Sequence, residues 1–327
     1  MFSAMRIIDD AKHRGGFVTS FVSVCGGLPS PEAVDNPLKY KFSWSPKGVI
    51  SASQNSARYR WEDHIVEIYG KELLQNAAPF LEEWSELQLE CLPNRDAIAY
   101  EKTYGIENAS TVFRGTLRYR GFSRLMHVFQ NMGLFETITS GEATWGELLE
   151  TLRLRRGGFA HLEDFLLACA DDDMDNAAGA KECLQWLGMD GNLKITDTSA
   201  SVVDQFCNIL EQKLQYKESE RDMVVMHHAI GVIFEDGTKE HHQSSLQAFG
   251  DESMTAMCKT VGYPTAAATE LILNGSLDDH RGLLLPTSKS VYEPILDSVK
   301  REGIVFNECV NVEPAPLAHL RESAVGT

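Results

Sequence analysis

The middle of the chain carries helical patterns and almost no strand pattern. Between residues 134 and 216, apolar residues recur every three or four positions, and runs of β-branched residues are scarce. The segment holds 15 acidic and 6 basic residues, so about half of the chain's formal charge of −17 falls within it. These features predict an all-helical insert with an acidic, solvated surface. We expect its helices at Trp145–Leu154, Phe159–Ala170, Ala177–Leu187 and Ser201–Tyr216.

Strand patterns occur on both sides of this segment. Upstream we expect strands at Phe17–Val24, where Gly26 and Gly27 end the strand, and at His64–Tyr69, Glu86–Leu92 and Thr111–Tyr119. Upstream helices are expected at residues 1–15, Pro46–Ala57 and Gly121–Met132. Downstream we expect strands at Asp222–Phe234, Lys239–Phe249 and Ile304–Phe306, and helices at about 252–261, 264–274 and 288–302. A strand and helix domain is thus interrupted by the insert and then resumed.

The charge balance and the cysteines exclude several classes of protein. With 30 Lys and Arg against 47 Asp and Glu, the chain offers no basic face for a nucleic acid. No apolar run approaches the roughly 18–20 residues that span a bilayer, and the N-terminus has no signal-peptide pattern. The seven cysteines are scattered and never form a CxxC pair, which favours reduced thiols in a cytosol-like or matrix-like compartment. No G-x-G-x-x-G or Walker A sequence marks a nucleotide cradle.

Two histidine pairs suggest a metal site but do not converge. Asp236-Gly237 is expected to form a two-residue hairpin turn, in which His242 faces Gly231 and His241 faces Val232. The pair at His227 and His228 then lies roughly 10 Å along the ladder, whereas metal ligands lie within about 2.1 Å of one ion. We therefore interpret the histidines as half-exposed sheet residues.

An acidic run has the spacing of a calcium loop, with carboxylates at positions 1, 3, 5 and 12: Asp171, Asp173, Asp175 and Glu182. Position six, however, is Asn176 where such loops use glycine, and a helix is expected from Ala177. An acidic turn before a helix N-terminus accounts for the same residues. We predict no metal site.

Two features could carry chemistry, and each has a structural alternative. Cys25 precedes Gly26-Gly27 at the expected strand end, and could be either a reactive thiol or a small buried residue. A basic cluster follows, in which the forked guanidinium groups suit carboxylates but could equally form surface ion pairs. Its members are Arg114, Arg118, Arg120 and Arg124. Local positive charge in an acidic chain favours an anion site slightly.

Five sequence blocks together resemble saccharopine dehydrogenase of the glutamate-forming type. They are CGGLPSPEAVDNPLKYKFSWSPKG at Cys25–Gly48, LPNRD at Leu92–Asp96, RGTLRYRGF at Arg114–Phe122, ERDMVVM at Glu220–Met226 and TAMCKTVGYPTAAAT at Thr255–Thr269. The resemblance covers about residues 3–308. Within the insert, ECLQWLGM at Glu182–Met189 is more similar to the bifunctional aminoadipic semialdehyde synthase of animals.

The resemblance implies an oxidoreductase of lysine biosynthesis or degradation. Such an enzyme converts saccharopine, NAD(P)⁺ and water to L-glutamate, 2-aminoadipate 6-semialdehyde and NAD(P)H, and it is expected to be a homodimer. Carried over onto this sequence, Gly26, Arg95, Thr116, Leu117 and Arg118 contact saccharopine. Ser45 contacts the NAD or NADP cofactor, and Cys25 is the candidate catalytic residue.

The resemblance also implies an α/β (α+β) fold around a mostly antiparallel sheet, without the N-terminal Rossmann domain that carries the glycine fingerprint. We expect a residual Rossmann-lobe helix at 1–16, a saccharopine-binding domain at 17–133 and 217–250, the insert at 134–216, helices packing towards the Rossmann lobe at 251–308 and a tail at 309–327. The isolated chain is expected to have weak or no activity. The alternatives are a non-catalytic binding module, a partner of a separately encoded Rossmann chain, and a related imine reductase of polyamine metabolism.

The expected cellular compartment depends on whether the chain is part of a longer enzyme. It is the mitochondrial matrix for part of an animal-type bifunctional enzyme, and the cytoplasm for a chain that is complete as given.

Overall fold

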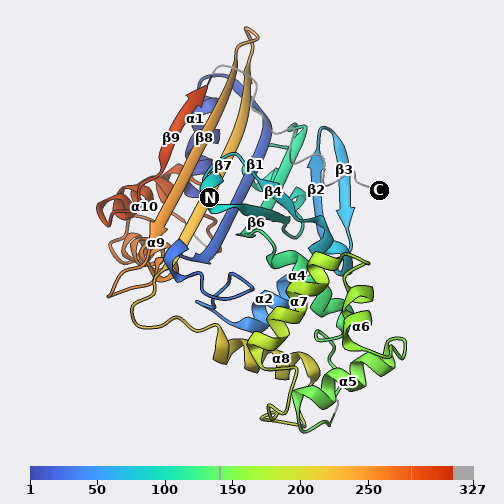
Figure 1. The fold of residues 1–327 in the computed structure, drawn as a ribbon. Helices are drawn as coiled ribbons and strands as arrows, with labels where there is room; N and C mark the ends of the chain where they lie inside the picture. The colour runs from blue at the N-terminus through green and yellow to red at the C-terminus, as the bar shows by residue number, and fades with distance from the viewer. Residues whose placement is uncertain (140, 281, 312–327) are drawn as a thin grey trace.

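A nine-stranded sheet organises the chain in the computed structural model, which describes residues 1–139, 141–280 and 282–311. Seven strands follow the order β3-β2-β6-β1-β7-β8-β9, and β5 pairs with both β4 and β6 (Figure 1). Only the β1–β6 pair is parallel, so the mostly antiparallel α/β fold expected from the sequence is confirmed. The strands are β1 (Gly16–Pro29), β2 (Ala57–Trp61), β3 (His64–Ile68), β4 (Ala78–Phe80), β5 (Leu89–Pro93), β6 (Thr111–Tyr119), β7 (Asp222–Phe234), β8 (Lys239–Phe249) and β9 (Asn307–Asn311).

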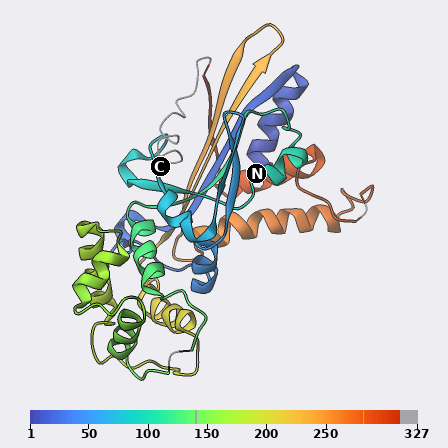
Figure 2. The ribbon, with the colours of Figure 1, turned by 90° about the vertical axis from the view of Figure 1, so that its right-hand side faces the viewer.

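The helices form two groups at different places on this sheet. Helices α1, α9 and α10 lie on one side of the long strands, while α5 to α8 gather beyond one end of the sheet (Figure 2). The 3₁₀ turn η2 (Gly70–Asn76) and short helices connect the strands. The α-helices are α1 (Phe2–His13), α2 (Pro46–Ala52), α3 (Glu101–Tyr104), α4 (Phe122–Met132), α5 (Trp145–Arg155), α6 (Leu162–Cys169), α7 (Met174–Leu187), α8 (Val202–Lys213), α9 (Ala256–Leu273) and α10 (Lys289–Arg301).

The four expected insert helices are present as α5 to α8. Their facing sides bury Leu148, Phe165, Leu184 and Phe206 completely, and α6 and α7 pack on α4 of the sheet domain. Thr144 and Glu147 form a reciprocal capping box at the start of α5. The chosen domain boundaries stay predictions, and the part of the tail beyond residue 311 lies outside the described residues.

Strand β1 continues past the point where its glycines were expected to end it. It runs through Gly26 and Gly27 to Pro29, because β7 pairs with it over that whole length. Pairing with β7 offsets the weak strand preference of the two glycines, and Gly26 also allows the close approach of Leu117 on β6. Cys25 is therefore an interior strand residue and not a strand end.

The β7–β8 hairpin differs from the expected register by one residue. Gly237, with φ of +84°, ends a three-residue loop in which Phe234 N donates to Thr238 O. The extra loop residue places His241 opposite Gly231 and His242 opposite Ile230. The histidines are also more buried than expected, since His227 and His228 are 1% exposed and His242 is 7% exposed.

Three further expectations about the elements were wrong. The helices expected at 252–261 and 264–274 are one helix, α9, which continues through Pro264. Threonine hydroxyls bonded to carbonyls one turn earlier, such as Thr265 Oγ1 to Val261 O, accompany this continuation. The last strand is β9 and not Ile304–Phe306, because Ile304 packs into the cluster formed with α9 and α10. Strands β2 and β4 were not expected.

None of the helices in the described residues combines the length and the apolar character that crossing a bilayer requires.

The buried His228 predicts an acid-sensitive fold. Burial lowers the pKa of His228 well below its usual range, and the positive charges of the Met1 amino group and His227 lower it further. The unfolded chain takes up a proton as pH falls through about 6.5 while native His228 stays neutral, so this residue removes roughly 1.4 kcal/mol of stability per pH unit below that point. Both ring nitrogens lack a hydrogen bond within the described part of the chain, and the ring stacks on Phe306.

We therefore expect His228→Leu to flatten the decline of unfolding free energy between about pH 6.5 and 5. Urea denaturation across this range measures the slope. The control is His64→Leu, at an exposed position on β3, which should keep the wild-type slope. An unchanged slope in His228→Leu would contradict the assignment.

Candidate functional site

The parallel pairing of β1 with β6 brings the expected site residues together. Cys25 is the pairing partner of Thr116 on β6 and of Met226 on β7. Because side chains alternate along a strand, Arg114, Thr116 and Arg118 lie on the same face as Cys25. The thiol of Cys25 is exposed, so the two expected motif blocks meet at an accessible surface of the sheet.

Gly26 sets how closely the two strands approach. A Cβ at position 26 would lie 2.7 Å from Leu117 O and 3.0 Å from Leu117 Cβ, closer than real Cβ atoms come to backbone. A side chain at this position would push β6 away from β1 and move Thr116 and Arg118 with it. Gly26 and Leu117 thus hold the site together by backbone packing.

Arg118 is a buried cation with no ion pair to a carboxylate in the part of the chain that the structure describes. Its side chain is 6% exposed and its guanidinium carbon lies 5.1 Å from the Tyr40 ring centre and 5.6 Å from that of Phe122. Nη1 donates to Leu117 O at 2.9 Å, and Nε has no hydrogen-bond partner among the described residues. Burying a charge with unmet hydrogen bonds is costly, and an anionic ligand is one kind of partner that would meet them.

The nearby carboxylates are already engaged. Glu90, directly opposite Arg118 on β5, accepts bonds of 2.9 and 2.8 Å from the backbone amides that begin α4. Asp96 contacts Arg58 and caps the turn at residues 98–100, and Glu101 pairs with Arg60 at 3.1 Å. None of these acids forms an ion pair with Arg118 among the described residues.

Two more arginines surround this face. The guanidinium carbon of Arg114 lies 4.1 Å from the Tyr100 ring centre, a cation–π contact that fixes its direction. Arg95 is exposed and has a left-handed backbone with φ of +52°, which is uncommon for arginine. Its loop is tied to β6 because Asn94 N donates to Arg114 O at 2.9 Å. The sequence reasoning named all three arginines but missed the rings that orient them.

The start of α1 lies beside the segment that precedes β6. Tyr104 Oη lies 3.2 Å from Met1 Sδ, which joins the two. Helix α1 also packs on β1 and β7, the strands that carry Cys25 and its pairing partner Met226.

Ser45 does not join this cluster. It is the N-cap of α2, where its Oγ accepts from Gly48 N, and α2 packs on α8 of the insert. The structure gives Ser45 no contact with Cys25, Thr116 or Arg118 within the described residues. Its expected role as a cofactor contact stays a prediction.

The basic cluster expected from the sequence is divided in two. Arg114 and Arg118 belong to the face with Cys25, whereas Arg120 and Arg124 line a separate cavity beside α4. The sequence placed the four together because they are close along the chain. The turn after β6 separates them in space.

Among the described residues, no group of three or more His, Cys, Asp or Glu side chains is placed to hold a metal ion. The acidic run has other bonds: Asp173 caps α7 through Asn176 N, and Asp171 Oδ2 lies 2.8 Å from His127 Nε2.

Comparisons with known proteins identify the same family as the motif blocks. Residues 1–304 match the saccharopine dehydrogenase C-terminal domain family. The chain is 38% identical over 328 residues to the α-aminoadipic semialdehyde synthase of Arabidopsis thaliana, covering 93% of this chain and 30% of that protein. It is 38% identical over 314 residues to the mitochondrial α-aminoadipic semialdehyde synthase of Rattus norvegicus, covering 93% of this chain and 33% of that protein. The chain thus spans about a third of these relatives.

A shorter relative is covered more completely. The chain is 37% identical over 317 residues to the NADP⁺-dependent, L-glutamate-forming saccharopine dehydrogenase of Saccharomyces cerevisiae, covering 93% of this chain and 70% of that protein. The apo structure of the L-glutamate-forming saccharopine dehydrogenase from the same yeast superposes with a TM-score of 0.85 at 35% identity. The superposition covers 95% of this chain and 71% of the yeast chain.

The close approach at Gly26 gives a first test of the site. We expect Gly26→Ala to lower the unfolding free energy by roughly 1–3 kcal/mol, because backbone atoms of Leu117 must move to admit the methyl group. The matched control is Gly262→Ala in α9, where nothing lies within 4 Å of the added methyl group. It should stabilise the protein by about 0.5–1 kcal/mol. Equal effects of the two substitutions in urea denaturation would contradict the tight β1–β6 contact.

Proposed function

The chain belongs to the saccharopine dehydrogenase C-terminal domain family, and we propose that it is the saccharopine-binding part of a glutamate-forming saccharopine dehydrogenase. The proposed overall reaction converts saccharopine, NAD(P)⁺ and water to L-glutamate, 2-aminoadipate 6-semialdehyde, NAD(P)H and a proton. The observation that carries the proposal is the buried, unpaired guanidinium of Arg118 on the face that holds Cys25.

Saccharopine suits this face because it has three carboxylates. We propose that Arg118 binds one of them through its two-pronged fork, replacing the partner that it lacks in the described residues. Arg114 and Arg95 bind the others, and Gly26, Thr116 and Leu117 provide the floor of the site. Polyamines are cations, so the same three arginines would repel the substrate of the polyamine-type alternative.

Cys25 is proposed to lie beside the carbon–nitrogen bond that reacts. Its exposed thiol can exchange a proton there while the imine is hydrolysed. This role uses the position of the thiol on the sheet face and needs no metal.

The described residues do not form a dinucleotide cradle. Ser45 offers an exposed hydroxyl on a seven-residue helix whose first amides are partly capped by that same hydroxyl, and no glycine fingerprint accompanies it. A pyridine nucleotide supplies hydride acceptance when bound. We propose that another domain holds most of it, while the residues of this chain bind and orient saccharopine. The homodimer and the cellular compartment stay predictions.

Substrate binding tests the proposal directly. We expect saccharopine to bind the chain in a calorimetric titration, and Arg118→Lys to weaken its affinity about tenfold or more, because lysine keeps the charge but loses the fork. The control is Arg155→Lys on α5, at an exposed position outside the site. A melting curve checks that the variant is folded. Unchanged affinity in folded Arg118→Lys would refute the role of Arg118.

Turnover separates the enzyme part from a binding module. The isolated chain should form NAD(P)H from saccharopine at least about a hundredfold more slowly than the same chain joined to a pyridine-nucleotide-binding domain, since the nucleotide must be held against the substrate. Absorbance of the reduced nicotinamide measures the rate. Equal rates for the isolated chain and the joined protein would contradict the proposal that another domain holds most of the nucleotide. Saccharopine binding without turnover in the joined protein would favour the non-catalytic module.

A further inference from the structure

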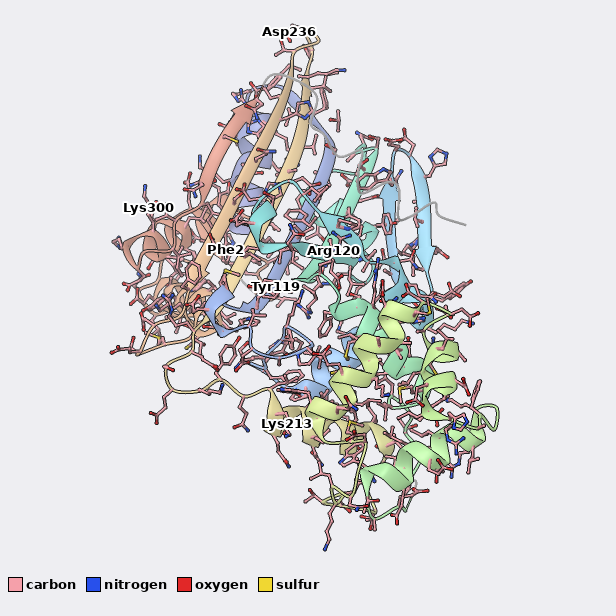
Figure 3. All side chains as sticks on the ribbon, viewed as in Figure 1. Phe2, Tyr119, Arg120, Lys213, Asp236 and Lys300 are labelled. Carbon is pink, nitrogen blue, oxygen red and sulfur yellow. The ribbon has the colours of Figure 1, made fainter. Side chains whose placement is uncertain are left out.

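A cavity of about 420 Å³ lies where the helical insert meets the sheet domain. Its walls come from η2, β4, β5, the turn after β6, α4 and the turn between α6 and α7. Arg120, labelled in Figure 3, marks its position between the end of β6 and the helices of the insert. None of Cys25, Arg95, Arg114 and Arg118 lines it, so it is separate from the proposed saccharopine site.

The carboxylates in its wall are committed to internal bonds. Glu90 accepts from the backbone amides of Gly121 and Ser123 at the start of α4. Asp173 caps α7 at a distance of 2.9 Å from Asn176 N. Asp171 lies 2.8 Å from His127 Nε2 and accepts from Gln75 Nε2 at 3.1 Å. Each of the three carboxylates thus has a hydrogen-bond partner within the described residues.

The arginines in the wall are not committed. Arg120 and Arg124 are exposed, are four residues apart and both line the cavity. Across residues 1–139, 141–280 and 282–311, neither guanidinium has an ion pair, a hydrogen bond or an aromatic contact. His127 is 9% exposed in the same wall, and its Nδ1 has no hydrogen-bond partner in that part of the chain. The cavity thus presents two arginines without partners among the described residues, in an otherwise acidic chain.

We propose that this cavity binds a small dianion, either a phosphate monoester or a dicarboxylate. Two guanidinium groups four residues apart can each offer a two-pronged donor fork to one such anion. The volume is within the usual range for small-molecule sites. A dianion that binds the folded state and not the unfolded chain stabilises the fold.

The test uses the full chain with inorganic phosphate and with malonate, each titrated at constant ionic strength by calorimetry and followed by thermal melting. At least one of the two should bind and raise the melting temperature, and the one that does identifies the class. Arg120→Gln with Arg124→Gln should weaken this binding at least about tenfold. The control Arg155→Gln removes the same kind of charge from an exposed position on α5 and should change the affinity less than about twofold.

Saccharopine titrations keep this proposal distinct from the proposed function. The Arg120 and Arg124 variant should retain the wild-type affinity for saccharopine, which also shows that it is folded. Arg118→Lys should retain the wild-type affinity for the dianion. The proposal is overturned when neither dianion binds, when the double variant binds as the wild type does, or when Arg118→Lys abolishes dianion binding. Each of these results is readable even when saccharopine itself fails to bind.

Discussion

The contact between β1 and β6 at Gly26 is the constraint on which the site depends. It joins segments about 90 residues apart in the chain as the single parallel pair among the described strands, with Cys25 paired to Thr116. A side chain at position 26 would meet the backbone oxygen of Leu117 at 2.7 Å. Since the side chains on this face inherit their spacing from the two backbones, that close approach determines whether the thiol and the guanidinium groups face one ligand.

The electrostatics follow from how the acidic residues are used. The chain carries a formal charge of −17, yet the carboxylates nearest to Arg118 are bonded to helix amides or to other arginines. Arg118 therefore stays cationic and unsatisfied in a buried, ring-lined position. The net charge determines which ligands the molecule repels at long range. Which ligand it binds at short range depends instead on the charged side chains that have no partner within the protein.

The sequence was sufficient to predict the fold class and the insert helices, whereas several local features of the sheet were not predictable from it. The insert helices have clear apolar periodicity and local caps such as that of Thr144 and Glu147, which need no distant partner. The strand was expected to end at the glycines of β1, but it continues through them because β7 pairs with them. The expected register of the β7–β8 hairpin was wrong by one residue, because Gly237 adopts a left-handed backbone and closes a three-residue loop. Ring contacts of Arg118 with Tyr40 bring together positions 78 residues apart, which no local pattern reveals.

The division of the arginine cluster shows how one turn can give neighbouring residues different chemistry. The guanidinium of Arg118 on β6 lies against the rings of Tyr40 and Phe122. Arg120, two residues later, lines the cavity beside α4 instead. The turn at Gly121, with φ of +103°, reverses the chain and starts α4, whose first amides bind Glu90. Glu90 lies opposite Arg118 on β5 and also lines the cavity beside Arg124, yet it accepts its hydrogen bonds from the amides that begin α4. Both proposed anion sites therefore rest on arginines that form no ion pair with this glutamate among the described residues.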